Sequence, residues 1–350
     1  MKLKKTFIKA CLIGAGRIGF KLEFDSKRLK PASHYGMWIS NKKVILTAIA
    51  EKNNLIPFKK KISKKIKIYN DYKKMIKVEK PDVISIATWK DSHYEITNSC
   101  INLGLKYIVL EKPLANNINQ ALKLHNKIKK NQTKIFVNHR RRFDEKIISL
   151  RKKIEKNIIG DIYHVSANYV YGILTTGTHL IDTIRMLLKK NCGEVSHVIG
   201  IKNKLNHFCP KDDCNIDGYI FFENGITASI QSLNMKDYDN FDIHLYGSKG
   251  LISIKGIGRD GFLYKVSKSK EHSGFTELKN KPIKLFGPKQ RNQFGKLSNN
   301  VVENIMNKNK KSLCDSYESL IDMIIINKLI ESSKIKSKKI KVSIPRKLKA

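Results

Sequence analysis

The chain has 350 residues, of which 41% are hydrophobic, and a formal net charge of +39. This length is large for one core and suits two domains. No run approaches the ~20 apolar residues that a membrane-spanning helix needs, and the basic start leads directly into an apolar strand instead of a secretory signal. We therefore expect a cytoplasmic protein without membrane contacts, with its six cysteines as free thiols.

The basic charge comes mainly from lysine, in a chain that is also rich in isoleucine and asparagine, a combination typical of A/T-rich coding sequence. Arginine, the side chain that recognises phosphate and guanine in bidentate fashion, is scarce. The lysine-rich runs hold few aromatic residues that could stack on bases. The charge therefore predicts no specific nucleic-acid partner and favours an anionic small molecule or nonspecific adhesion to polyanions.

The first 142 residues alternate β-rich runs with helix-period segments. Buried parallel strands are expected at residues 7–13, 44–50, 82–87, 105–110 and 134–138, and helices at 72–78, 93–103 and 117–130. This alternation predicts an α/β fold with a doubly wound parallel sheet over residues 1–142. Together with a glycine motif after the first strand, Gly14–Gly19, it predicts that these residues form a Rossmann dinucleotide-binding domain. The long connection 20–41 is expected to place residues 31–34 in a surface loop that reaches toward the site.

The pattern changes after residue 142. A helix at 145–157 and a strand at 162–171 are followed by a helical stretch to residue 189 and by successive strands with turn signals from 194 to 266. Two helices, at 294–306 and 314–332, precede a basic tail. We expect residues 143–350 to form a second, α+β domain with a mostly antiparallel sheet and helices on one face.

A glycine motif connects the first strand to the helix that is expected after it. Gly14 permits a tight turn, Gly16 lets the backbone approach a pyrophosphate, and Gly19 lets helix and strand pack closely; Arg17 and Ile18 complete this candidate cofactor-binding turn.

Glu51 follows the second strand, where a carboxylate would accept the ribose hydroxyls of NAD. Lys52 and Arg17 leave NADP open as the alternative, because either could meet a 2′-phosphate. An ordinary carboxylate at a strand end is the other interpretation of Glu51.

Lys112 lies at the end of a later buried strand, between Glu111 and Pro113. An ammonium there could hydrogen-bond a substrate hydroxyl and stabilise alkoxide character as hydride leaves. Thr88, Trp89 and His93, which follow the strand expected at 82–87, are candidates for the nicotinamide half of the cofactor, and Glu111 is a further cofactor-binding candidate. The alternative for this group is a Ser/Thr helix cap followed by a surface histidine.

His179 lies in a Gly-Thr-His-Leu-Ile-Asp segment and suits the role of base for a hydroxyl proton. Thr178 and Asp182 are the neighbouring substrate-binding candidates, and a buried structural histidine is the alternative. Arg141 and Arg142 could clamp an anionic substrate group or take part in ion pairs.

Three residues at the start of the expected antiparallel strands, His207, Cys209 and Cys214, form a His-x-Cys-x4-Cys pattern. They lack the fourth ligand and the tighter spacing of a zinc site. No metal is predicted.

These motifs together resemble the Gfo/Idh/MocA family of NAD(P)-dependent oxidoreductases. The resemblance is carried by the glycine motif, Ser85–Thr88 with His93, Glu111–Ala115, 138–143, the His179 segment and Gly247–Gly250. It implies a second domain with a large open sheet for substrate binding and for oligomerisation as a homodimer or homotetramer. It also implies catalytic roles for Lys112 and His179 and substrates among sugars, polyols and sugar nucleotides. Thr175 stands where many members carry an aspartate, so the resemblance leaves the proton relay to His179 and Lys112, with Thr175 as a substrate contact.

The sequence thus predicts hydride transfer between nicotinamide and a hydroxyl or keto carbon of a sugar derivative, with surface-polysaccharide sugars as one setting. The alternative is a Rossmann protein that binds NAD(P) as a sensor or regulator without turnover.

Overall fold

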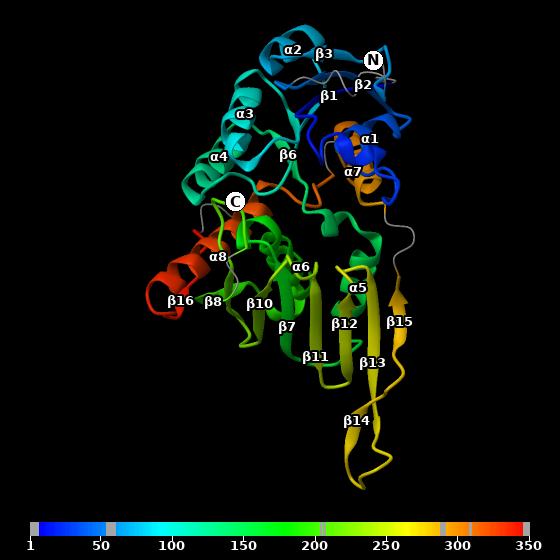
Figure 1. Ribbon diagram of the computed structural model, residues 1–350, viewed down its shortest axis with the longest axis vertical. Coiled ribbons are helices and arrows are strands. Elements are labelled where there is room, and N and C mark those ends of the chain that lie inside the picture. Colours follow the sequence, from blue (N-terminus) through cyan, green and yellow to red (C-terminus); the bar gives the residue numbers. More distant parts are fainter. Residues whose placement is uncertain are drawn as a thin grey trace. The chain divides into compact units, whose positions relative to one another are not determined.

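The computed structural model describes residues 7–53, 61–203, 205, 208–287, 292–307 and 310–345. The chain forms two compact units, which are described separately here (Figure 1). The first is built mainly from Met1–Asp144 and Gln290–Leu320, and the second from Glu145–Lys289 and Ile321–Lys347. The first unit thus includes a helix that the sequence pattern assigned to the range of the second domain.

The first unit contains a six-stranded parallel sheet with the order β3-β2-β1-β4-β5-β6. Its strands are β1 (Ile8–Ile13), β2 (Val44–Ala50), β3 (Lys67–Tyr69), β4 (Val83–Ile86), β5 (Tyr107–Leu110) and β6 (Lys134–Val137). The predicted doubly wound sheet is confirmed. The strand order reverses between β1 and β4, so a ligand crevice is expected at the carboxyl ends of these two strands.

Five helices flank this sheet, and most begin at a residue that caps them. They are α1 (His34–Ile39), α2 (Tyr72–Glu79), α3 (Lys90–Asn102), α4 (Ile118–Lys130) and α7 (Gln293–Met306). The side chains of Asp71 and Asn117 accept backbone N–H groups at the starts of α2 and α4. These caps explain why the helical periodicity of the sequence placed both starts correctly.

The segment after the glycine motif differs from the expected helix. It forms turns and a short 3-10 helix, η1 (Lys21–Phe24), before a cis Lys30–Pro31 bond. The Asp25 carboxylate accepts the backbone N–H of Lys27 and the Nε–H of Arg28, which competes with helix continuation.

The prediction that residues 31–34 form a surface loop is wrong. Ser33 and His34 are fully buried. Ser33 caps α1 by accepting the N–H of Gly36, and its hydroxyl donates to the Glu23 carboxylate. The His34 side chain hydrogen-bonds the buried carboxylate of Glu111.

The second unit contains a ten-stranded sheet with the order β14-β13-β12-β11-β7-β10-β9-β8-β16, and β15 pairs with β13. Its strands are β7 (Ile162–Val170), β8 (Val195–Lys202), β9 (Ile216–Phe222), β10 (Thr227–Leu233), β11 (Asp242–Gly247), β12 (Gly250–Lys255), β13 (Asp260–Lys268), β14 (Thr276–Leu278), β15 (Ile283–Phe286) and β16 (Ile340–Lys341). All pairs are antiparallel except β7 with β10, which confirms the mostly antiparallel sheet.

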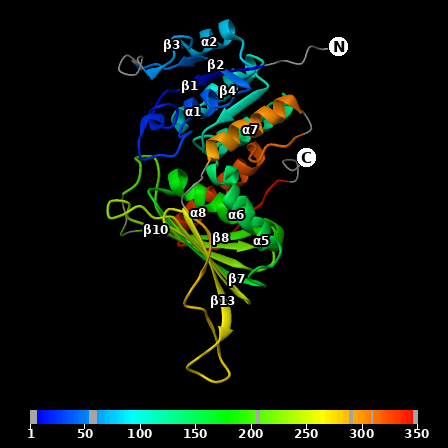
Figure 2. The ribbon, with the colours of Figure 1, turned by 90° about the vertical axis from the view of Figure 1, so that its right-hand side faces the viewer.

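Helices cover one face of this sheet (Figure 2). They are α5 (Glu145–Glu155), α6 (Thr178–Cys192) and the part of α8 (Ser316–Lys334) that belongs to this unit. A side chain at Gly200 of β8 would collide with the backbone carbonyl of Leu329, so the glycine permits the close packing of α8. On the other face, Ile201, Tyr219 and Tyr246 are 40–42% exposed.

All six cysteines are free, and among the described residues no helix combines the length and apolar character needed to cross a bilayer.

Candidate active site

The glycine turn after β1 has the geometry of a phosphate cradle. Gly14 has φ +87°, and a Cβ there would lie 2.8 Å from the carbonyl oxygen of Ala87. A Cβ at Gly19 would collide with the carbonyl of Gly14, whereas a Cβ at Gly16 would meet no atom within 4 Å. The first and last glycines therefore set the turn, and the middle one leaves space for a dinucleotide pyrophosphate to approach the backbone.

Glu51 closes one side of this turn. Its Oε2 accepts the N–H of Ala15 at 2.7 Å, and its Oε1 accepts the N–H of Asn53 at 3.0 Å. Two of about four acceptor positions of the carboxylate are used in this way, which leaves acceptor capacity for ribose hydroxyls. Arg17 is exposed and Ile18 half-buried on the turn, where the sequence analysis placed them as cofactor contacts.

The connection between β4 and α3 carries the residues predicted to contact the nicotinamide half of the cofactor, and the structure changes the interpretation of one of them. His93 is fully buried, with Nδ1 2.7 Å from the carbonyl of Pro113 and Nε2 3.1 Å from that of Thr88. Burial lowers its pKa despite these carbonyls. Its ring nitrogens thus face backbone, so His93 is neither a surface residue nor a direct cofactor ligand; it joins this loop to the Lys112–Pro113 segment. Ser92 donates to the Thr88 hydroxyl at 2.7 Å, and Trp89 is 85% exposed.

Glu111 is a buried carboxylate of the first unit. Its Oε1 accepts the Nε2–H of His34 at 2.8 Å and the amide of Asn138 at 2.6 Å. Burial alone would raise its pKa, but the hydrogen bond and charge of His34, the Asn138 amide and the charge of Lys112 lower it to about 2. The carboxylate is therefore ionised, and it fixes the backbone directly before the partly exposed Lys112 and its cis bond to Pro113.

The arginine-rich segment after β6 is η3 (Arg140–Phe143). Arg142 is buried and forms an ion pair with Glu318 at 3.0 Å within the same unit. This contact favours the ion-pair interpretation of Arg142 over the substrate clamp. Arg141 is half-buried.

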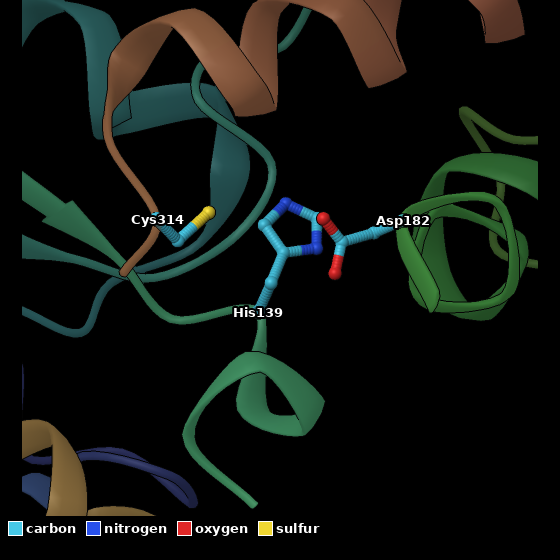
Figure 3. Close-up of side chains that lie close together, drawn as sticks. All are labelled: His139, Asp182 and Cys314. Atoms are coloured by element: carbon cyan, nitrogen blue, oxygen red, sulfur yellow. The ribbon is translucent and has the colours of Figure 1, made fainter. Parts of the chain in front are cut away.

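His139 and Cys314 lie near one another in the first unit, with their ligand atoms within 4.8 Å (Figure 3). Two ligand atoms do not make a zinc site, which takes four. Asp182, also drawn in Figure 3, belongs to the second unit. The His-x-Cys-x4-Cys pattern of the sequence was considered as a zinc site. Its His207 lies outside the described residues, and its Cys209 thiol donates to a backbone carbonyl at 3.2 Å.

In the second unit, the turn before α6 is a π-helical turn, η4 (Ile173–Gly177). Such turns occur often at functional sites. Thr175 lies in it and donates its hydroxyl to the Oδ2 of Asp213 at 2.8 Å; the N–H of Thr175 donates to the same oxygen at 2.8 Å. The sequence analysis named Thr175 as a substrate contact, and the structure adds a carboxylate partner, Asp213, from a loop 38 residues away.

The helix α6 that follows carries the other candidates. His179 is 8% exposed, and its backbone carbonyl accepts the hydroxyl of Thr183. Thr178 and Asp182 are buried. The Oγ1 of Thr178 has no hydrogen-bond partner among the described residues. The helix therefore collects a base, an acid and a hydroxyl within two turns, as the sequence spacing indicated.

Three polar residues around these sites were missed or misplaced by sequence reasoning. Asn138 and Asp213 were not singled out, and His34 was placed on the surface. Each acts through a partner distant in the sequence: Glu111 for Asn138 and His34, and Thr175 for Asp213. No local spacing signals such pairs.

The parallel sheet, the glycine cradle and the acidic residue after β2 define a dinucleotide-binding protein. Family comparison specifies it further: the family model "Oxidoreductase family, NAD-binding Rossmann fold" matches residues 8–139, and "Oxidoreductase family, C-terminal alpha/beta domain" matches 172–342. These matches span most of the chain, which therefore belongs to the Gfo/Idh/MocA oxidoreductase family. The resemblance to this family and the expected NAD-binding Rossmann domain are confirmed.

Individual relatives are distant. The uncharacterized oxidoreductase YhhX of Escherichia coli is 24% identical over 214 residues, which are 56% of this chain and 59% of that protein. A structure of levoglucosan dehydrogenase in complex with NADH has a TM-score of 0.74 at 17% identity, covering 96% of this chain and 99% of the other. A super-repressor mutant of Gal80p from Saccharomyces cerevisiae has a TM-score of 0.76 at 14% identity, covering 96% and 98%.

Proposed function

We propose that the protein is an NAD(P)-dependent dehydrogenase or reductase that acts on a hydroxyl or keto carbon of a sugar, polyol or sugar nucleotide. The observation that carries the proposal is the combination of an open glycine cradle at Gly16 with Lys112, which directly follows an ionised, buried Glu111. The levoglucosan dehydrogenase structure with NADH has the same fold and supports a sugar as substrate class. Surface-polysaccharide sugars are one setting for such an activity.

The cofactor would supply the carbon that gives or takes hydride. The residues of the first unit would hold it: the glycine turn binds the pyrophosphate, and Glu51 accepts ribose hydroxyls, which favours NAD over NADP. Thr88 and Trp89 line the β4 end of the crevice. Glu111 fixes the backbone before Lys112, whose ammonium polarises the reacting oxygen and stabilises the negative charge that develops on it.

His179 would exchange the hydroxyl proton of the substrate. A neutral imidazole accepts that proton during oxidation and returns it during reduction. Thr178 and Asp182 on the same helix would contact the substrate or orient the ring, and Arg141 would meet an anionic group where the substrate carries one.

The first test is fluorescence of the purified protein with NADH and, separately, NADPH. Levoglucosan, D-glucose, myo-inositol and sugar nucleotides are then added with the oxidised or reduced cofactor. We expect tight binding of one cofactor and turnover with one substrate class. Lys112→Ala and His179→Ala should each lower kcat at least 100-fold while NADH still binds. Turnover near that of the wild type in either variant would contradict its assigned role.

A sensor without turnover is the second candidate. The shared fold with a Gal80p repressor mutant favours it, as does Thr175 at a position where many members of the family carry an aspartate. A tightly bound NAD(H) whose redox state no sugar changes would support this alternative.

The uncovered face of the second unit's sheet suggests self-association. Ile201, Tyr219 and Tyr246 lie exposed on it, and apolar and aromatic side chains gathered on one face commonly mark an interface. We therefore propose a homodimer or homotetramer that buries this face, and a cytoplasmic location consistent with six free thiols.

A further inference from the structure

One edge of the second unit's sheet continues into a protruding hairpin. The last residues of β13 and the whole of β14 extend beyond the other strands of this sheet (Figures 1 and 2). Within the hairpin, Val266 pairs with Leu278, and residues 270–284 are exposed without interruption. Residues 265–284 form this hairpin and are called the arm below. The arm is turned almost entirely toward its surroundings, so its side chains are available to a partner.

Hydrogen bonds give the tip of the arm a defined shape. The N–H of Ser269 donates to the carbonyl of Phe275 at 2.9 Å and closes the loop 270–274. The hydroxyl of Ser269 accepts the N–H groups of Glu271 and His272, each at 3.3 Å. Phe275, at the point where the loop rejoins the strand, is 70% exposed. Its exposed ring therefore belongs to an ordered turn.

Further apolar side chains accompany Phe275 along the arm. Val266 and Leu278 are 37% and 38% exposed, and Ile283 is 48% exposed. Val266 and Leu278 are directly opposite each other in the ladder, so their side chains share one face of the ribbon. Exposed apolar residues that are gathered in this way mark a protein or membrane contact.

The arm is also strongly basic. Its six lysines against two glutamates give a formal net charge of +4. Lys284 pairs with Asp260 at 3.4 Å, and the other five form no ion pair with any described residue: Lys265, Lys268, Lys270, Lys279 and Lys281. These ammonium groups favour an anionic partner outside the chain. A second copy, with its own formal charge of +39, does not supply one.

We propose that the arm docks the protein onto an anionic lipid bilayer: its lysines meet the phosphate headgroups, and Phe275 inserts into the interfacial layer. Nucleic acid also offers phosphates, and an aromatic ring stacks on bases, but aliphatic side chains such as Val266 and Leu278 find an apolar phase in a bilayer. Such a contact is peripheral and needs no membrane-spanning segment. For this surface it replaces the expectation of a protein without membrane contacts. The inference goes beyond the proposed function and does not depend on it.

Vesicle flotation with the purified full chain tests the docking, without cofactor or substrate. Vesicles of phosphatidylcholine alone are compared with an equal mixture of phosphatidylcholine and phosphatidylglycerol, at low and at physiological ionic strength. We expect binding to the anionic vesicles only, and weaker binding as salt screens the lysines. No binding of the wild type to the anionic vesicles at either ionic strength would overturn the proposal.

Two variants of the arm test its parts. Lys268→Glu combined with Lys270→Glu should weaken binding by more than about tenfold, because each lysine near an anionic surface contributes about fivefold in affinity. Phe275→Ser should weaken binding by about fivefold, because it removes the apolar area that inserts. Wild-type binding by Phe275→Ser would contradict the proposal, since the tip would then not enter the bilayer.

Matched substitutions elsewhere in the second unit separate the arm from general charge. Lys152→Glu combined with Lys153→Glu, at exposed positions of α5, changes the net charge by the same amount as the arm variant. Tyr238→Ser removes another aromatic ring, which is 60% exposed. Both controls should bind like the wild type. An equal loss in the α5 variant would mean adhesion through net charge alone and would overturn the proposal.

The other partners of a basic arm give different results. A wild type that binds duplex DNA but not anionic vesicles, and loses DNA in Lys268→Glu with Lys270→Glu, would assign the arm to nucleic acid and overturn the bilayer. A lower mass of Phe275→Ser in light scattering would assign the arm to a contact between copies and overturn it as well. Thermal unfolding followed by circular dichroism should be unchanged in all variants, because the replaced side chains are exposed.

Discussion

Glu111→Gln is the change whose effect can be worked out most directly from the structure. Glutamine is close in shape to a protonated glutamate, and its Oε1 can still accept the N–H groups of His34 and Asn138. The pKa of Glu111 is lowered from 4.5 to about 2 in the folded protein. At 1.36 kcal/mol per pKa unit, ionised Glu111 then stabilises the first unit by about 3 kcal/mol.

The pH dependence follows from the sign of this shift. Because the folded pKa lies below the unfolded one, the stabilisation is fully present above pH 4.5 and is lost as the pH falls toward 2. In that window the unfolded chain binds one more proton than the folded one at this site, so stability falls by up to about 1.4 kcal/mol per pH unit. Glu111→Gln should remove this contribution to the slope and should already cost about 3 kcal/mol at pH 7.

Both tryptophans, Trp38 and Trp89, lie in the first unit, and Trp38 is fully buried. Tryptophan emission during urea titration therefore reports unfolding of this unit separately, at pH 7, 5, 4 and 3. Glu303→Gln on α7, a half-exposed partner of Lys310, is the control and should change little. If Glu111→Gln matched the wild type both at pH 7 and in its slope below pH 4.5, Glu111 would not be the ionised buried group described here.

Three further changes separate alternatives that the sequence left open. Gly16→Ala adds a Cβ to the cradle that meets no protein atom within 4 Å, so NADH affinity by fluorescence titration should fall while the urea midpoint stays constant; unchanged affinity would place the cofactor elsewhere. Arg142→Gln should cost about 1–3 kcal/mol in the tryptophan-detected unfolding because it removes the charged partner that lies 3.0 Å from Glu318, with an unaltered substrate KM; a raised KM without loss of stability would restore the substrate clamp. Tyr219→Glu should shift the mass measured by light scattering to that of a monomer, and an unchanged oligomer would exclude the open sheet face as the interface.

The sequence was most informative where one periodicity decided the structure. Parallel strands covered on both faces read as continuous apolar runs, which is why β1, β2, β4, β5 and β6 were all anticipated. β3 was missed because Lys67–Tyr69 is an edge strand of three residues in a lysine-rich run, two of them exposed. The glycine turn was also readable, since its spacing reflects steric needs that act within a few residues.

The sequence was least informative where a side chain's role depends on a distant partner. His34 looked like part of a surface loop because its acceptor, Glu111, is 77 residues away. His93 fitted a cofactor contact or a surface position equally well, and the carbonyl of Pro113, 20 residues on, decided against both. Asp213 lies 38 residues from Thr175 in a loop without periodicity, so no pattern could have connected them.

The two carboxylates have a common physical role, each within its own unit. Glu111 lies directly before Lys112, and its Oε1 accepts two hydrogen bonds. The oxygens of Asp213 accept four, two of them from Thr175, which lies four residues before His179. Donors in this number fix the orientation of a carboxylate, so the neighbouring functional group is held before a substrate arrives. Polar groups that are already in place need not move as charge develops in the reaction. This preorganisation is usually the largest electrostatic contribution that a protein makes to such a step. We therefore expect substitutions of Glu111 and Asp213 to impair function through the geometry of Lys112 and Thr175. Replacement by the corresponding amide should reveal this effect more clearly than replacement by alanine, because an amide keeps the shape of the side chain and changes only its charge and polarity.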